Sequence, residues 1–162
     1  GLAATSEGLK VIEFNVRFGD PETLVVLERL GSDLGELLHA AATGDLASVP
    51  DLAWRDESAV AVVLASEGYP LAAQTGREIT GLDEVGEEGC TVIHAGTERD
   101  SDGTLRSSGG RVLSVVALEN MLEDARVRAQ SAIARVLLEG SHYRTDIAER
   151  AALGAIERVT QL

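Results

Sequence analysis

Three polar residues at alternate positions near the start of the chain, Glu13, Asn15 and Arg17, carry the densest chemical signal in the sequence. Side chains at alternate positions of a β-strand point to the same face, so the three would lie together. Glu13 offers an anionic oxygen and Asn15 a neutral carbonyl oxygen, which are ligands that magnesium prefers when nucleotide phosphates complete its octahedron. Arg17 could pair bidentately with a carboxylate or a phosphate. One alternative stays open, because the solvated face of an edge strand shows the same alternation.

A glycine turn and two more carboxylates follow this polar face, in the order Gly19-Asp20-Pro21-Glu22. Pro21 suits the first position of a helix, whose N-terminus attracts negative charge. We therefore expect Asp20 and Glu22 to lie beside the polar face and to take part in binding a substrate. The simpler alternative is that Asp20 caps the helix and Glu22 complements its dipole.

The second candidate is the run Gly109-Gly110-Arg111. Two glycines in succession can expose backbone N–H groups to an anion, and Arg111 adds positive charge. An ordinary bend before a strand is the alternative reading.

The cysteine and the histidines fit structural roles better than chemical ones. Cys90 is the only cysteine, so it predicts a small buried apolar residue and excludes an internal disulfide. The three histidines stand apart from one another, without the ligand spacing of a zinc site: His39, His94 and His142.

Two elements must position the first candidate. The apolar run at residues 9–14 predicts a buried strand, and the next segment predicts one long helix from about Pro21 to Thr43, with apolar residues at three- and four-residue steps and Gly44 as its stop. Residues 44–57 lack periodicity and read as a linker.

Beyond the linker, short β-type runs alternate with turn signals. We expect strands at 59–65, 77–80, 90–96 and 110–118, with a hairpin tip and return at 97–110 around Asp102-Gly103. Asn120 should cap a helix that runs toward Gly140, with Val136 and Leu137 on its buried face, and residues 145–162 show a further helical pattern.

These elements predict an α+β protein in which a strand and a long helix, residues 1–43, end one domain. The linker at 44–57 leads to a separate domain, residues 58–162, with a small and mostly antiparallel sheet and packed helices.

Composition narrows the classes of function. The 162 residues carry 14 Lys and Arg against 27 Asp and Glu, a net charge of -13 that would repel nucleic acid and anionic membrane surfaces. No apolar run approaches the roughly 20 residues of a membrane helix, and the first residues lack a signal-peptide pattern. A cytoplasmic protein is expected.

A family resemblance emerges from the longer motifs. The stretch VIEFNVRFGDPET at 11–23 resembles the signature near the end of the ATP-grasp domain of glycinamide ribonucleotide synthetases. The likeness continues in order along nearly the whole chain, through SDLGELLHAA, AVAVVLASEGYP, EITGL, VIHAGT, SSGGRVLSVVAL and EGSHYRTDI.

The resemblance implies an enzyme that joins glycine to phosphoribosylamine with ATP as co-substrate. Glu13 and Asn15 would hold Mg²⁺ or Mn²⁺, and Arg17 would orient the glycine carboxylate or its acyl phosphate. The turn with Asp20 and Glu22 would shape the glycine end of the pocket.

By the same resemblance, Gly109, Gly110 and Arg111 would contact the ribose phosphate of the substrate. Tyr143, Arg144 and Asp146 also match the family, with domain packing as their expected role.

The sequence lacks other parts of such an enzyme. It has no glycine-rich loop opening an α/β unit and no lysine-bearing ATP lid, and Lys10 is its only lysine. We therefore expect a missing N-terminal portion of the same polypeptide and an inactive isolated chain. The alternatives are another ATP-grasp ligase or carboxylase, or a non-catalytic binding module with this fold.

Overall fold

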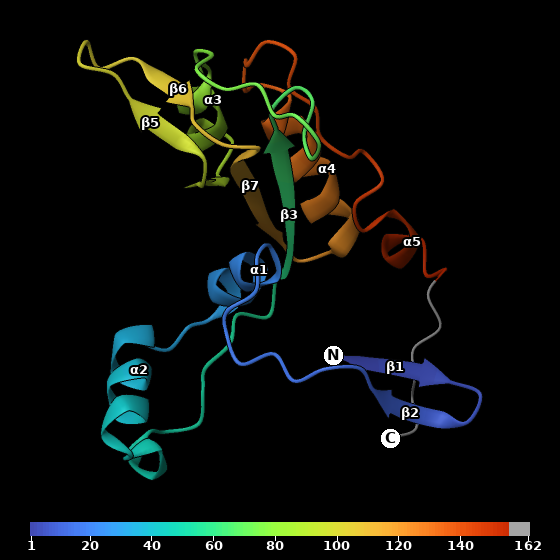
Figure 1. Cartoon of the computed structure of the whole chain (residues 1–162). Helices are drawn as coiled ribbons and strands as arrows, with labels where there is room; N and C mark the ends of the chain where they lie inside the picture. The colour runs from blue at the N-terminus through green and yellow to red at the C-terminus, as the bar shows by residue number, and fades with distance from the viewer. Residues whose placement is uncertain (156–162) are drawn as a thin grey trace.

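The computed structural model describes residues 1–155, and its core is a three-stranded antiparallel sheet. β7 (Arg111–Glu119) lies in the centre between β3 (Ser58–Ala65) and β4 (Thr91–His94), and it pairs antiparallel with both. The three strands of this sheet come from residues 58–119, after the N-terminal hairpin and two helices (Figure 1). This confirms the mixture of helices and antiparallel strands expected from the sequence, including three of the four expected strands.

One face of the sheet packs against α4 (Leu122–Ile133), as Figure 1 shows. The side chains that meet there are aliphatic, which follows from an aromatic content of 3%. The fully enclosed residues of this core include Val62, Leu64, Val112, Leu113, Val115, Ala125, Ala129 and Ile133. Cys90 is buried beside them, and burial raises the pKa of its thiol, so its expected role as a small apolar residue is confirmed.

Smaller elements surround the sheet. β5 (Thr97–Arg99) and β6 (Leu105–Ser107) form the expected hairpin, in which Thr104 N donates to Asp102 Oδ1 at 2.9 Å. α3 (Leu82–Glu87), which the sequence pattern did not predict, precedes β4. α5 (Glu149–Ala152) covers only part of the expected C-terminal helix, and positions 156–162 of that prediction lie outside the described residues.

The prediction of one helix at 21–43 is wrong, because the chain forms α1 (Glu22–Arg29) and α2 (Leu34–Thr43) instead. Between them, Leu30 forms a bridge with Trp54 and Gly31 N donates to Ala53 O at 2.8 Å. Asp33 then starts α2, since its Oδ1 accepts from Glu36 N at 3.0 Å. Backbone pairing with a distant segment therefore replaces a helical turn. α2 ends at Gly44 as expected.

The strand expected at 9–14 is also shorter than predicted, and it is exposed, so the prediction of a buried strand is wrong. β2 (Gly8–Val11) pairs with β1 (Leu2–Thr5) in a hairpin that stands apart from the central sheet (Figure 1). Residues 12–17 belong to no strand.

Two further boundaries differ from the predictions for one common reason. The segment 77–80 is not a strand, and α4 ends at Ile133, well before Gly140. Thr80 and Leu137 instead exchange two backbone hydrogen bonds, of 3.1 and 3.0 Å. Leu137 is consequently 64% exposed and not buried as expected, whereas Val136 is buried. Asn120 does not cap α4, whose N-cap is Met121 without a side-chain hydrogen bond.

The expected linker is partly structured and leads directly into the sheet. Residues 44–57 contain a short 3-10 helix, Leu46–Ser48, and lead along the bridge at Trp54 into β3. α1 contacts β3 and β7, whereas α2 lies away from the sheet (Figure 1). The division into 1–43, 44–57 and 58–162 stays a prediction. No helix within residues 1–155 is long and apolar enough to cross a membrane.

Candidate functional site

Glu13, Asn15 and Arg17 contact one another in a row, although no strand holds them. Asn15 Nδ2 donates to Glu13 Oε1 at 3.3 Å, and Arg17 Nη1 donates to Asn15 Oδ1 at 3.4 Å. An extended backbone gives the two-residue alternation that a strand would give. The side chains are therefore brought together as the sequence predicts, but on a segment outside β2.

The opposite side of this segment is apolar and exposed. Phe14 is 85% exposed, Val16 94% and Phe18 63%. Contiguous exposed apolar side chains usually mark a surface that another part of a protein covers. The segment thus separates a polar row from an apolar row.

The polar row has the donor types of a magnesium site but is incomplete by itself. The 3.3 Å between Glu13 Oε1 and the Asn15 amide resembles the roughly 3 Å between neighbouring ligands of a magnesium octahedron with bonds of about 2.1 Å. Rotation of the Asn15 amide would turn its oxygen toward Glu13. Within residues 1–155, no three His, Cys, Asp or Glu side chains form a metal-binding group. The two residues fit a cation that takes most of its ligands elsewhere.

The turn at Gly19 has an arrangement that differs from a helix cap. The N-cap of α1 is Pro21, and no side chain caps this helix, so the capping alternative for Asp20 is wrong. The Glu22 carboxylate folds back over Gly19, where any side chain would collide with it. Both acidic side chains are exposed, which leaves them accessible to a small ligand.

Asp20 instead binds Arg111, the first residue of β7. Arg111 Nη1 lies 3.2 Å from Asp20 Oδ2 and donates to the Asp20 main-chain oxygen at 3.2 Å. The two residues are 91 positions apart in the sequence. This contact joins the two groups of residues that the sequence singled out separately.

The glycines before Arg111 allow two close packings. A Cβ on Gly110 would collide with the ring of Tyr69, and Gly109 crosses Gly96 so closely that a Cβ on Gly96 would lie 2.6 Å from Gly109 Cα. Ser66 fixes the bend, since its hydroxyl donates to Gly109 O at 2.8 Å. The amides of Gly109 and Gly110 donate no hydrogen bond to any group in the described part of the chain.

Arg111 also lines a cavity of about 300 Å³. Its other walls come from the ends of β3 and from two loops: Val63, Ala65, Tyr69, Pro70, His142, Tyr143 and Arg144. Backbone bonds of 2.9 Å in both directions between Ala65 and His142 hold the second loop against β3. The cavity is thus mostly apolar, with two arginines among its lining residues.

The second guanidinium is also held by an aspartate. Arg144 donates from Nε and Nη2 to the two Asp146 carboxylate oxygens, at 2.9 and 2.8 Å. The hydrogen bond from Arg144 holds the pKa of Asp146 below its ordinary value, and it raises the pKa of Arg144. Arg144 lies in the cavity wall, a position that the sequence reading, which expected domain packing, did not foresee.

Sequence reasoning missed Tyr69, Pro70 and His142 as cavity residues. The only available signal was Tyr69-Pro70 itself, an aromatic residue beside a proline in a chain with two tyrosines. These residues meet because the backbone of β3 pairs with the loop at His142. A local sequence pattern does not show such a contact between distant segments.

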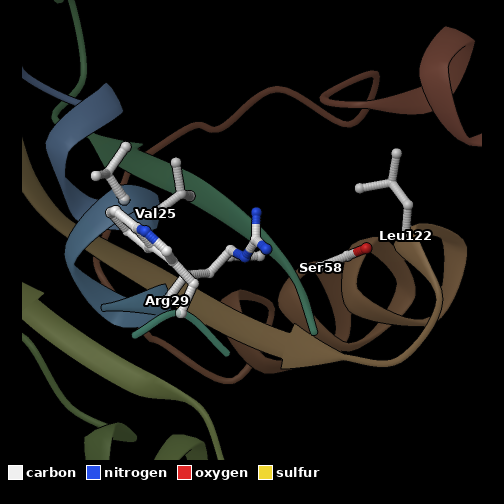
Figure 2. Close-up of a pocket in the computed structure, with 7 residues that line it drawn as sticks. Val25, Arg29, Ser58 and Leu122 are labelled. Carbon is white, nitrogen blue, oxygen red and sulfur yellow. The ribbon is translucent and has the colours of Figure 1, made fainter. Parts of the chain in front are cut away.

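A larger cavity of about 510 Å³ lies elsewhere, between α1, the start of β3 and the start of α4. Figure 2 shows Val25 and Arg29 on α1, with Ser58 and Leu122 on the other side. The Arg29 guanidinium donates to Arg55 O from Nε and Nη2, at 3.3 and 3.0 Å, so it ties the linker to α1. This cavity contains none of the candidate site residues, and Arg29, the one cation among its lining residues, has a structural role.

The arrangement around Asp20 and Arg111 can hold anions and a shared cation. The polar row supplies a carboxylate, an amide and a guanidinium, while the smaller cavity supplies two more guanidinium groups. Such groups can bind and orient carboxylates and phosphates.

Comparison with known proteins identifies several similar molecules. Residues 59–150 match the family model described as phosphoribosylglycinamide synthetase, C domain. A Streptomyces coelicolor protein named phosphoribosylamine-glycine ligase is 56% identical over 155 residues, which cover 94% of this chain and 37% of that protein. A Mycobacterium tuberculosis protein of the same name is 54% identical over 156 residues, which cover 96% of this chain and 36% of that protein.

A solved structure shows the same arrangement of the backbone. The crystal structure of a phosphoribosylamine-glycine ligase from Thermotoga maritima matches with a TM-score of 0.73 and 35% identity, over 91% of this chain and 36% of that one. The chain therefore spans about a third of the length of the relatives it matches.

Proposed function

This chain belongs to the phosphoribosylglycinamide synthetase family, and from that premise we propose that it is the C-terminal part of a ligase that joins glycine to phosphoribosylamine with ATP. The observation that carries the proposal is the similarity, over 94% of the chain, to a relative of that name. The shared name also favours this reaction over those of other ATP-grasp ligases and carboxylases. Residues 1–43 would then end the ATP-grasp domain.

The proposed reaction has two steps. A glycine carboxylate oxygen attacks the γ-phosphorus of ATP, which gives glycyl phosphate and ADP. The amine of phosphoribosylamine then attacks the acyl carbon, so that the amide forms and phosphate leaves. Both steps gather negative charge, and catalysis of phosphoryl transfer depends mainly on positioning and charge stabilisation.

In this proposal, Glu13 and Asn15 hold Mg²⁺ or Mn²⁺ beside the ATP phosphates. The metal would neutralise charge on the transferred phosphoryl group. The support is the donor types and the 3.3 Å between the two side chains. Arg17, next in the row, orients the glycine carboxylate or the acyl phosphate.

The neighbouring turn would form the glycine end of the pocket, with Asp20 and Glu22 facing the substrate. The Glu22 carboxylate, which lies over Gly19, and the exposure of both acidic side chains support this role. An exposed carboxylate there could receive the ammonium group of glycine.

Gly109, Gly110 and Arg111 would bind the phosphate of phosphoribosylamine. Two features support this proposal: the amides of the two glycines have no partner in residues 1–155, and Arg111 lines a cavity with a second guanidinium. The remainder of the polypeptide would supply the adenine pocket and the ATP lid, and we expect the whole protein in the cytoplasm.

The metal assignment can be tested in the full-length polypeptide by comparing Glu13→Gln with Asn15→Ala. Glu13→Gln should lower turnover by about a hundredfold or more, since metal ligands stabilise the transition state by several kcal/mol. It should also raise the magnesium concentration at which turnover is half-maximal. Asn15→Ala should lower turnover less than Glu13→Gln does, because a neutral amide does not offset the charge of a divalent cation. Turnover and magnesium dependence are the measurements.

Glu7→Gln serves as a matched control, because Glu7 is an exposed glutamate on the hairpin turn whose partner is Lys10. Near-wild-type activity of Glu13→Gln at limiting magnesium would show that the polar row is structural. In that case the metal assignment would be wrong.

A further inference from the structure

We propose that Asp20 is a positioning residue that holds Arg111 at the mouth of the 300 Å³ cavity, where Arg111 binds the phosphate of a phosphorylated sugar substrate. This inference rests on the proposed function and adds a role for Asp20 beyond the glycine end of the pocket. Asp20 acts through Arg111 and need not touch the phosphate itself.

The Asp20 carboxylate does not cap its own helix. Aspartate before a proline at a helix start ordinarily caps the helix. Here α1 has no side-chain cap, and the carboxylate is directed to Arg111 instead. The local sequence does not require this contact.

Arg111 is held by only one of its guanidinium nitrogens. Only its Nη1 contacts Asp20, through both the carboxylate and the main-chain oxygen, each at 3.2 Å. Its Nε and Nη2 have no hydrogen-bond partner among residues 1–155. A guanidinium has five donors in a planar fork, so the groups that remain can bind an anion while Asp20 fixes the plane.

The cavity beside Arg111 has the residue types of a small-molecule site. Arg111 and Arg144 line it, and each is paired with an aspartate, Asp20 and Asp146 respectively. Tyr69 and Tyr143 are also among the residues that line it. Apolar walls with a few convergent polar groups are typical of small-molecule sites of about 300–1,000 Å³, and two guanidinium groups select a phosphate.

Two effects of Asp20 oppose each other. Its negative charge would repel an incoming phosphate, whereas its contact reduces the freedom of the Arg111 side chain. The pair is about half exposed, with relative exposures of 41% and 57%, so solvent screens the repulsion. The fixed orientation of Arg111 should therefore outweigh the repulsion. Loss of the Asp20 carboxylate should then weaken phosphate binding, whereas it would strengthen binding if repulsion were the larger effect.

The experiment is a double-mutant cycle in the full-length polypeptide, with Asp20→Ala, Arg111→Gln and the double variant. Asp20→Ala should raise the KM for phosphoribosylamine by about two- to fivefold, as for an exposed ion pair, and leave the KM for ATP unchanged. Arg111→Gln should raise the KM for phosphoribosylamine by about tenfold or more, as for the loss of a hydrogen bond from a charged group. In the Arg111→Gln background, Asp20→Ala should have no further effect, because its partner is gone.

Ribose 5-phosphate, a stable compound with the same phosphate, provides a second readout as a competitive inhibitor. Its inhibition constant should rise in parallel with the KM. Asp51→Ala, at an exposed aspartate of the linker, and Arg135→Gln, at an exposed ion pair with Glu88, are the matched controls.

The outcomes separate the inference from the proposed function. If Arg111→Gln weakens phosphoribosylamine binding but Asp20→Ala leaves it unchanged, strengthens it, or acts equally in the Arg111→Gln background, the positioning role is wrong and the phosphate site stands. If Arg111→Gln changes neither the KM nor the inhibition constant, the phosphate site is wrong, and the positioning role falls with it.

Discussion

At the residue scale, the candidate site consists of charged side chains that hold one another in pairs or rows. Asn15 lies between Glu13 and Arg17, and Asp20 holds Arg111. Each of these groups is exposed or partly exposed, so each contact contributes little to stability. Under the proposed function, these contacts would orient donors and acceptors toward a ligand.

The pair of Arg144 and Asp146 allows a test by pH. The hydrogen bond from Arg144 lowers the pKa of Asp146 in the folded protein, so the pair stabilises the fold above the ordinary pKa of aspartate and loses this contribution as the pH falls through the lowered value. Asp146→Asn should therefore unfold at a slightly lower temperature than the wild type at neutral pH. This difference in unfolding temperature should disappear in strongly acidic solution. Thermal unfolding of the chain across that pH range is the measurement.

Asp51→Asn is the control for this experiment, because Asp51 is exposed in the linker. If the difference in unfolding temperature between Asp146→Asn and the wild type stays unchanged in strongly acidic solution, the carboxylate charge does not have this role. The effect is small in every case, since the pair is exposed and screened by solvent.

At the scale of elements, backbone crossings decide where helices and strands end. The break between α1 and α2 and the early end of α4 both occur where the chain pairs with a distant segment, at Trp54 and at Thr80. The start of β7 depends on the crossing of Gly96 and Gly109. The elements therefore end where tertiary hydrogen bonds replace local ones.

The crossing predicts a strong effect of Gly96→Ala. The added Cβ would lie 2.6 Å from Gly109 Cα, 2.7 Å from Gly109 N and 2.8 Å from Arg111 O, so the two backbones would have to separate. We expect a loss of about 2–4 kcal/mol in the free energy of unfolding, the range of severe overpacking. Chemical denaturation of the chain measures it.

Gly86→Ala is the matched control, since a Cβ there meets no atom within 4 Å and alanine favours the helix. It should leave stability unchanged or raise it slightly. Equal stability of Gly96→Ala and wild type would mean that the two loops do not cross as described.

At the scale of the whole molecule, the chain combines a well-packed sheet and helix with an N-terminal segment that buries little. In that segment the exposed large apolar residues are Leu2, Leu9, Val11, Ile12, Phe14, Val16 and Phe18. The relatives are about three times as long as this chain. In the proposed enzyme, the rest of the polypeptide would cover this apolar surface and complete the ATP site.

We expect the isolated chain of residues 1–162 to fold but to lack activity. The sheet and α4 supply its core, whereas most of the contacts that ATP needs would come from other parts of the polypeptide. Cooperative thermal unfolding should be seen together with no glycine-dependent release of ADP in a coupled assay. ADP formation that requires both glycine and phosphoribosylamine would refute this expectation, and the full-length polypeptide is the positive control.

The sequence by itself determined the features that depend on local spacing and composition. The two-residue spacing brought Glu13, Asn15 and Arg17 together even without a strand, because any extended backbone alternates its side chains. Apolar runs located β3, β4 and β7, and the Asp102-Gly103 turn located the hairpin. The long motifs indicated the family, which the comparisons confirm.

Only the tertiary structure decided which distant residues meet. Asp20 and Arg111 are 91 positions apart, and the walls of the cavity range from Val63 to Arg144. The helix ends at Arg29 and Ile133 follow from backbone pairing with remote segments. Helix propensity is a weak, local preference of less than about 1 kcal/mol per residue for most amino acids, so hydrogen bonds and packing between remote segments, which no local pattern contains, override it.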